Sequence, residues 1–423
     1  MSETWVQDCR RQFPGLNRQL NGQPMVFFDG PAGTQVPQRV IDAISRYLTH
    51  SNANHGGKFQ TSRETDAMFA AANRALADFV GADDPGEIIW GQNMTSLTFS
   101  FSRALAREWG PGDEIIVTAL DHDANVTPWV MAAQDRGATV HVLDFDRLDG
   151  TLDQDAYRRL LSPRTRLVAL GCASNATGGV NPVGAMIAQA HAVGAQVFLD
   201  AVHYGPHDLI DVRKWNCDFL ACSTYKFFGP HLGVLWGRRS ELERLTPYKV
   251  RPCSEELPWR WMTGTQSYET IAGALACVDY LADLGRQVSE DWQLERRPAL
   301  AEAMQAIETY EMRLAWRLIE GLQRLDGIRI YGITEPSRTR ERFSTVSFTH
   351  ERVSVPQLNR ELAARGICVW GGHYYALEFA RRMGLETEGM IRVGLLHYNT
   401  EQEVDRFLRE LAEIIESALV VEA

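Results

Sequence analysis

The chain has 423 residues, 45% of them hydrophobic and 23% charged, and a formal net charge of −11. This length and composition are typical of a globular enzyme with one large core and a second, smaller one. The acidic charge without a basic stripe argues against a nucleic-acid partner. No run approaches the roughly 18 apolar residues that a membrane span requires.

The cysteines show neither C-x-x-C spacing nor a pairing pattern, which indicates reduced thiols rather than a disulfide framework. The first residues, M-S-E-T-W-V-Q-D-C-R-R, lack the apolar centre of a signal peptide. We therefore expect a cytoplasmic enzyme. The seven cysteines are Cys9, Cys172, Cys217, Cys222, Cys253, Cys277 and Cys368.

Residues 1–25 predict a short helix and an arm, which we expect to pack with the smaller domain. The sequence M-V-F-F-D-G-P-A-G-T then predicts a strand that ends in a turn over residues 30–33. Its glycines let backbone approach a ligand closely, although a plain strand-to-helix turn explains them equally well. Amphipathic helices are predicted over residues 37–47 and 61–80.

The segment I-I-W-G-Q-N-M-T-S-L predicts a strand, a turn and the start of a helix. Thr95 and Ser96 offer hydroxyls and backbone N–H groups at that helix start, which suits a phosphate. The same residues could simply cap the helix, and both roles are compatible.

Two further strands end in polar residues. D-E-I-I-V-T-A-L-D-H-D-A-N leads to His122, and R-L-V-A-L-G-C-A-S-N leads to Asn175. A single histidine after a strand is more often a surface residue. Strands that alternate with helices predict a mainly parallel sheet covered on both faces.

The centre of the chain has two apolar runs that predict neighbouring buried strands, over residues 197–199 and 218–222. The first ends at Asp200, and the second continues into S-T-Y-K-F-F-G, which contains Lys226. A buried carboxylate and lysine are costly unless each has a partner. They could form a salt bridge, or they could hold a pyridine cofactor by its ring nitrogen and its aldehyde. Gly229 and Gly233 just beyond favour the cofactor.

After an irregular segment rich in Pro and Trp, helices are predicted over residues 271–284 and 299–325. The remaining pattern of short strands and helices predicts a small α/β domain. We place the large domain at residues 26–285 and the small one at residues 286–423.

These motifs resemble those of the class-V aminotransferase branch of fold-type I enzymes, which includes cysteine desulfurases and selenocysteine lyases. The likeness extends from F-F-D-G-P-A-G-T to I-R-V-G-L-L-H-Y-N-T. It implies pyridoxal 5'-phosphate (PLP) as cofactor and an α/β fold. The large domain would contain a mainly parallel, seven-stranded-type sheet, followed by a small C-terminal domain.

The resemblance also implies residue roles. Lys226 would form the Schiff base, Asp200 would hold the ring nitrogen protonated, and His122 would stack on the ring. Arg392 would bind the carboxylate of an amino-acid substrate. Thr265 would reach the phosphate of a partner subunit, which implies a homodimer with shared active sites. The remaining expected cofactor contacts are Met94, Thr95, Asn175, His203, Ser223 and Tyr225, the other substrate contacts are Ala32, His373 and Tyr375, and no metal ligand is expected.

His203 and Tyr225 stand where many desulfurases have glutamine and histidine. A larger departure lies in the loop W-G-G-H-Y-Y-A-L-E-F, where the family's mobile cysteine aligns with Tyr375 and an arginine with Trp370. Cys368 is close by, but its apolar strand I-C-V-W predicts a core position. Without a loop thiol, persulfide formation lacks its nucleophile.

Three functions remain open. The first is a C–S lyase or desulfurase-related enzyme that acts by β-elimination without a persulfide cysteine. The second is an aminotransferase or epimerase on the same scaffold. The third is a catalytically silent binding protein, against which the joint presence of Asp200, Lys226, His122 and Arg392 argues.

Overall fold

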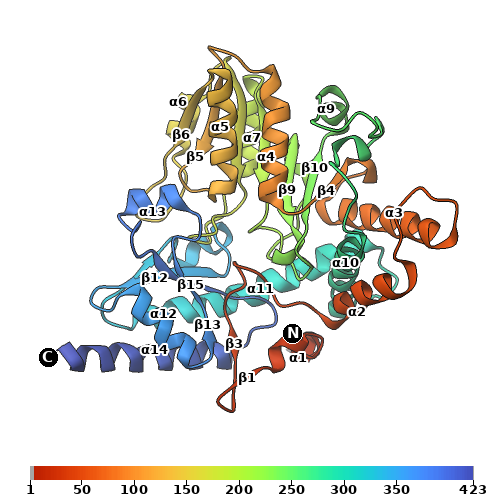
Figure 1. Ribbon diagram of the computed structural model, residues 1–423. Helices are drawn as coiled ribbons and strands as arrows, with labels where there is room; N and C mark the ends of the chain where they lie inside the picture. Colours follow the sequence, from red (N-terminus) through yellow and green to blue (C-terminus); the bar gives the residue numbers. More distant parts are fainter. Residues whose placement is uncertain (1–3, 423) are drawn as a thin grey trace.

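The computed structural model describes residues 4–422. At its centre is a seven-stranded sheet in the order β4-β10-β9-β8-β7-β5-β6 (Figure 1). Strands β5 to β9 run parallel, and β10 is antiparallel to β4 and β9. The predicted mainly parallel sheet is confirmed. The strands are β4 (Ile88–Gly91), β5 (Glu114–Thr118), β6 (Thr139–Leu143), β7 (Thr165–Gly171), β8 (Gln196–Asp200), β9 (Phe219–Ser223) and β10 (Gly233–Gly237).

Helices cover this sheet, as expected for strands that are buried on both faces. α4 and α5 pack against each other over the strands, α7 packs on β7 and β8, and α10 packs on α2, α3 and α11. The helices up to this point are α1 (Thr4–Arg11), α2 (Gln38–Arg46), α3 (Gln60–Val80), α4 (Met94–Leu105), α5 (Thr127–Arg136), α6 (Gln154–Leu160), α7 (Val183–Ala192), α8 (Val212–Trp215), α9 (Arg239–Arg244), α10 (Tyr268–Val288) and α11 (Arg296–Gln323).

A smaller antiparallel sheet in the order β11-β12-β15-β14 lies beyond α11 and has its own apolar core, which includes Phe348, Val393 and Phe407 (Figure 1). Its strands are β11 (Ile328–Tyr331), β12 (Thr345–His350), β14 (Trp370–Gly372) and β15 (Met390–Gly394). The accompanying helices are α12 (Val355–Ala364), α13 (Leu377–Met383) and α14 (Glu401–Glu422).

The apolar segment I-C-V-W, expected as one strand, is divided between two sheets. Its first half is β13 (Ile367–Cys368), which pairs in parallel with β3 (Val26–Phe27). Its second half, from Trp370, is β14 beside β15. The division brings the N-terminal segment against the smaller sheet.

The N-terminal segment contacts both cores. Val6 packs in the core of the smaller sheet, whereas Phe13 packs against Phe228 and Tyr280 of the large core. A hairpin of β1 (Gln19–Leu20) and β2 (Gln23–Pro24) precedes β3. No helix in the described part of the chain is long and apolar enough to cross a bilayer.

Candidate active site

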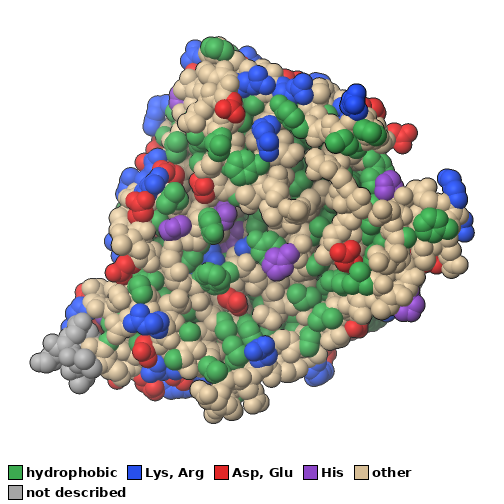
Figure 2. All heavy atoms as spheres, viewed as in Figure 1, with side chains coloured by type: hydrophobic (Ala, Val, Ile, Leu, Met, Phe, Trp, Pro, Cys, Tyr) green, Lys and Arg blue, Asp and Glu red, His purple; other side chains and the backbone are tan. Residues whose placement is uncertain are grey.

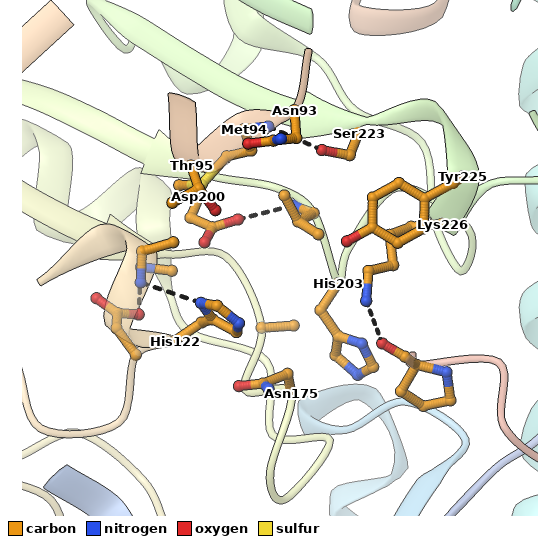
Figure 3. A pocket seen from close by; sticks show the side chains of 16 residues that line it. Asn93, Met94, Thr95, His122, Asn175, Asp200, His203, Ser223, Tyr225 and Lys226 are labelled. Carbon is orange, nitrogen blue, oxygen red and sulfur yellow. Dashed lines mark hydrogen bonds between the residues drawn. The ribbon is translucent and has the colours of Figure 1, made fainter. Parts of the chain in front are cut away.

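Polar residues gather where the central parallel strands end, and they line a cavity with an empty volume of about 580 Å³ (Figure 3). The carboxyl ends of parallel strands share one edge of a sheet, which is where such folds bind ligands. The cavity brings together nine of the predicted residues: Met94, Thr95, His122, Asn175, Asp200, His203, Ser223, Tyr225 and Lys226.

Lys226 ends a short 3-10 turn that follows β9. Its Nζ donates hydrogen bonds to the carbonyl oxygens of Pro31 and Ala32, the latter at 3.1 Å. These carbonyls belong to the turn after β3, whose glycines predicted that backbone could approach a ligand closely. Burial, and then the cation of Arg392, lower the pKa of Lys226 to about 7, while the Asp200 carboxylate opposes both effects. The amine is therefore largely uncharged just above neutral pH.

Asp200 ends β8, and its Oδ1 accepts a hydrogen bond from the backbone N–H of Val202 at 2.9 Å. Burial raises the pKa of Asp200 to about 6, against the lowering effects of that bond and of Lys226. A buried carboxylate in this environment suits a protonated ring nitrogen, with which it would form an ion pair.

Asp121 is a second carboxylate in the cavity wall, and the sequence reasoning missed it. It accepts hydrogen bonds from Gly171 N at 2.8 Å and Asn125 Nδ2 at 3.3 Å. Burial, and then the charge of Asp200, raises the pKa of Asp121 well above its usual range. Its position directly after the buried strand β5 was the available signal.

The start of α4 faces the same cavity. The Asn93 side chain accepts from Ser96 N at 2.8 Å, so Asn93 is the helix cap, and the expectation that Thr95 or Ser96 fills this role is wrong. Met94 N donates to Ser223 Oγ at 3.1 Å. Thr95 does not cap the helix and lines the cavity beside the helix N-terminus, which attracts anions.

His122 follows β5, and its Nδ1 accepts from Ala124 N at 3.0 Å. Burial, together with the cations of Lys226 and Arg392, lowers the pKa of His122 to about 4, so the imidazole is neutral. The ring of Tyr375 stacks on it with centroids 5.2 Å apart.

Arg392 lies in β15 and is only 4% exposed. Its Nη1 donates to Asn175 O at 2.9 Å, and its guanidinium lies 4.1 Å from the centroid of the Tyr374 ring. Among residues 4–422, no carboxylate lies within ion-pair distance of this guanidinium. A buried cation without a carboxylate partner is costly and suits an anionic ligand.

A wider hollow of about 1380 Å³ adjoins the cavity, lined in part by Ala32, His122 and Tyr375. Figure 2 shows histidine side chains around a hollow in the middle of this face. Tyr375 is 68% exposed, and His373 Nδ1 accepts from Tyr375 N at 3.2 Å. Thr265 lies apart, exposed in a separate cavity beside Gly264.

The donor set fits PLP. Among the residues that the structure describes, Asn175 Oδ1 and His203 Nε2 are buried atoms without a hydrogen-bond partner, so they are available to a ligand. An uncharged lysine amine suits the aldehyde, Asp200 suits the ring nitrogen, and the start of α4 with Ser223 suits the phosphate.

Comparisons with known proteins agree with this geometry. The class-V aminotransferase family model matches residues 26–407. A cysteine desulfurase of Pectobacterium carotovorum is 31% identical, over 97% of this chain and 98% of its own length. A probable cysteine desulfurase of Vibrio cholerae is 32% identical, over 96% and 98%. The cysteine desulfurase of Synechococcus elongatus is longer, and this chain spans 64% of it at 31% identity.

Solved structures with the same fold include a cysteine desulfurase from Thermococcus onnurineus, with a TM-score of 0.86 and 25% identity over 97% of this chain and 98% of that one. The crystal structure of the cysteine desulfurase CsdA (S-sulfonic acid) from Escherichia coli has a TM-score of 0.82 and 27% identity over 98% of both chains.

Proposed function

The chain belongs to the class-V aminotransferase family and is a PLP-dependent enzyme, and we propose that it cleaves a C–S bond of an L-amino acid by β-elimination. Sulfur would leave as a free thiol or sulfide rather than as a persulfide on the protein. The expected product from cysteine is pyruvate with ammonia and sulfide.

The loop over residues 373–376 carries this proposal. The family resemblance would place Tyr375 at the position of the desulfurase cysteine, and two hydrogen bonds to carbonyl oxygens of the loop attach it to the large core. Asp123 N donates to Tyr375 O at 2.7 Å, and Asn175 Nδ2 donates to Tyr374 O at 2.9 Å. A thiol is thus missing from this loop, and sulfur has no protein acceptor there.

Cys368 is the cysteine nearest this loop in sequence. It is half-buried in β13, and burial together with the charge of Asp29 raises the pKa of its thiol to about 11, against the opposing effect of Arg18. The nucleophile is the thiolate, so a raised pKa makes Cys368 a poor acceptor.

We assign the chemistry as follows. PLP supplies an aldehyde that captures an amine and a ring that withdraws electrons from the substrate's Cα. Lys226 would hold the cofactor covalently until the amino group of the substrate displaces it, and the freed, uncharged amine would then be in place to take the proton from Cα. Asp200 would keep the ring nitrogen protonated, His122 would pack on the ring, and Arg392 would orient the substrate carboxylate.

Elimination breaks the Cα–H and Cβ–S bonds. The proton goes to the Lys226 amine, the electron pair of the Cα–H bond forms the Cα–Cβ double bond, and sulfur leaves with the Cβ–S pair. Addition of water to the released enamine product then yields a keto acid and ammonia. Lys226 returns its proton to the leaving sulfur, so no external oxidant or reductant is required.

Product analysis tests the proposal. The purified enzyme is incubated with a panel of L-amino acids that includes cysteine and S-alkyl cysteines, and keto acid, ammonia, sulfide, alanine and protein persulfide are measured. Keto acid and ammonia in equal amounts support β-elimination. Alanine with a persulfide mapped to Cys368 contradicts it and assigns a desulfurase. Transfer of the amino group to an added keto acid assigns an aminotransferase, and racemised substrate an epimerase.

A pair of variants sharpens this test. Tyr375→Cys introduces a thiol in the loop and is expected to give some alanine and a persulfide on that thiol. Tyr375→Ser, of similar size but without the thiol, is expected to give neither. Lys226→Ala is expected to lose the visible absorbance of bound PLP and all turnover. Full turnover in Lys226→Ala without an added amine would reject the assignment of this lysine.

A further inference from the structure

A line of buried polar side chains connects the cavity wall with α11. His203 and His207 lie in the turn after β8, and their rings meet edge to face with centroids 5.2 Å apart. His207 Nδ1 lies 2.6 Å from Glu311 Oε2, and the two side chains are 3% and 2% exposed. Ser344 Oγ donates to the same carboxylate at 3.2 Å.

This arrangement is costly for a purely structural contact. His203 Nε2, at the cavity end of the line, is buried without a hydrogen-bond partner among residues 4–422, and the Glu311 carboxylate is buried beside the backbone of His397 at the other end. Unpaired buried polar atoms are rare in folded proteins and often mark a functional site. Apolar residues would fill the same space between α11 and β12 at lower cost.

Several charged groups face this line. Lys226 and Arg392 approach His203 from the cavity side, and burial together with His207 and these cations lowers its pKa well below the usual range. Glu311 lies on the far side with His397, and burial raises the pKa of Glu311. His203 is therefore a neutral imidazole, with one N–H and one acceptor nitrogen.

Figure 3 shows the His203 ring in the cavity between Asn175 and Lys226. A neutral imidazole at a cofactor can offer either a donor or an acceptor, and its neighbours decide which nitrogen carries the proton. His207 contacts His203 directly, and Glu311 fixes His207 through the short bond to Nδ1.

We propose that His207 and Glu311 are positioning residues that act on bound PLP through His203, by holding its ring in place beside the cofactor. This proposal shares one premise with the proposed function, namely that PLP binds in this cavity. Residues packed between α11 and the smaller sheet would then influence the cofactor.

The visible absorbance of bound PLP tests this proposal without any substrate. For wild type, Glu311→Gln and His207→Gln, the absorbance maximum and the pH at which the band is half-converted are measured. Each variant is then repeated in a His203→Gln background. We expect both variants to shift the pH midpoint, by about half a pH unit or more, and we expect no shift between His203→Gln and the corresponding double variants.

A matched control uses a second histidine–carboxylate contact. His191 Nε2 lies 2.9 Å from Asp218 Oδ2, and neither residue lines the cavity. His191→Gln should leave the absorbance midpoint unchanged and lower stability less, because this contact is 28% and 12% exposed. Thermal unfolding of every variant reports the structural contribution separately. If Glu311→Gln does not fold, His207→Gln carries the test, since it leaves Glu311 its bond from Ser344.

Unchanged absorbance in folded, PLP-loaded Glu311→Gln and His207→Gln proteins would overturn the proposal. An equal shift with and without His203 would also overturn it, since the effect would then bypass that residue. Failure of the product analysis for β-elimination leaves these spectra interpretable, so the two proposals fail separately.

Discussion

The chemistry of the Lys226 amine is set by its burial and by two charged neighbours. Burial and the cation of Arg392 disfavour the charged ammonium, while Asp200 favours it, and the resulting pKa is about 7. An ordinary lysine would be almost fully protonated at neutral pH and therefore a poor nucleophile for an aldehyde. The cavity thus contains a reactive amine before any substrate arrives.

The rate of PLP capture by cofactor-free protein is expected to follow this amine. The uncharged form grows as pH rises through the lysine pKa, so the rate should increase with a midpoint near pH 7 rather than near 10.5. Stopped-flow absorbance after mixing with PLP at several pH values measures it. A midpoint above pH 9 would contradict this account of the site.

Two variants should move the midpoint in opposite directions. Arg392→Gln removes a cation that disfavours the ammonium, so the midpoint should rise. Asp200→Asn removes a carboxylate that favours it, so the midpoint should fall. The same stopped-flow measurement distinguishes the two, and an unchanged midpoint in both variants would show that burial alone governs the amine.

Among the elements, β15 lies close against the turn after β3. Gly394 N donates to Phe28 O at 2.8 Å, and a Cβ on Gly394 would lie 1.9 Å from Pro31 Cδ. Gly394→Ala should therefore push β15 away from the turn that accepts the Lys226 hydrogen bonds. We expect a loss of about 1–3 kcal/mol in the free energy of unfolding, measured in urea, together with weaker PLP binding.

Gly184 provides the matched control for this glycine. It is exposed in α7, and a Cβ there would meet no heavy atom within 4 Å. Gly184→Ala should stabilise the protein by about 0.5 kcal/mol through helix preference and leave PLP binding unchanged. Equal effects of the two substitutions would show that the contact with Pro31 is not what makes Gly394 necessary.

The sequence predicted elements best where the pattern was local. Apolar runs located β8 and β9, and polar residues after them located Asp200 and Lys226, because parallel strands end at a common edge. His122 and Arg392 could be selected only through the family resemblance, since one histidine or arginine carries little signal alone.

Non-local pairings could not be predicted. The division of I-C-V-W between β13 and β14 depends on β3, far away in the chain. The capping role of Asn93 rather than Thr95 depends on a difference of one or two residues in where α4 begins. Asp121 and Glu311 were missed because the sequence does not show which carboxylates become buried.

At the scale of the whole molecule, we propose a homodimer whose subunits share active sites through Thr265. Lys226→Ala and Thr265→Glu should each be inactive, the second because its carboxylate would repel the cofactor phosphate. A heterodimer of the two would contain one site with both Lys226 and Thr265 intact. Activity should therefore return when the variants are co-expressed and the heterodimer is purified with two different tags.

The control is a subunit that carries both substitutions, paired with wild type. In a shared arrangement the wild-type subunit receives the partner's defective Thr265, so this heterodimer should be inactive. If Thr265 serves its own subunit, the pattern reverses: the single-variant heterodimer stays inactive and the double-variant heterodimer keeps one working site. Active Thr265→Glu homodimers would exclude Thr265 from the phosphate altogether.

The pairing of β3 with β13 also bears on how this protein is made. The turn that contains Pro31 and Ala32 emerges early from the ribosome, but β13, which anchors β3, is synthesised only near the end of translation. Closing so long a stretch of chain is slow and entropically unfavourable. Until β13 is made, β3 lacks its strand partner, so the pairing that anchors this end of the turn forms only after most of the chain has been synthesised.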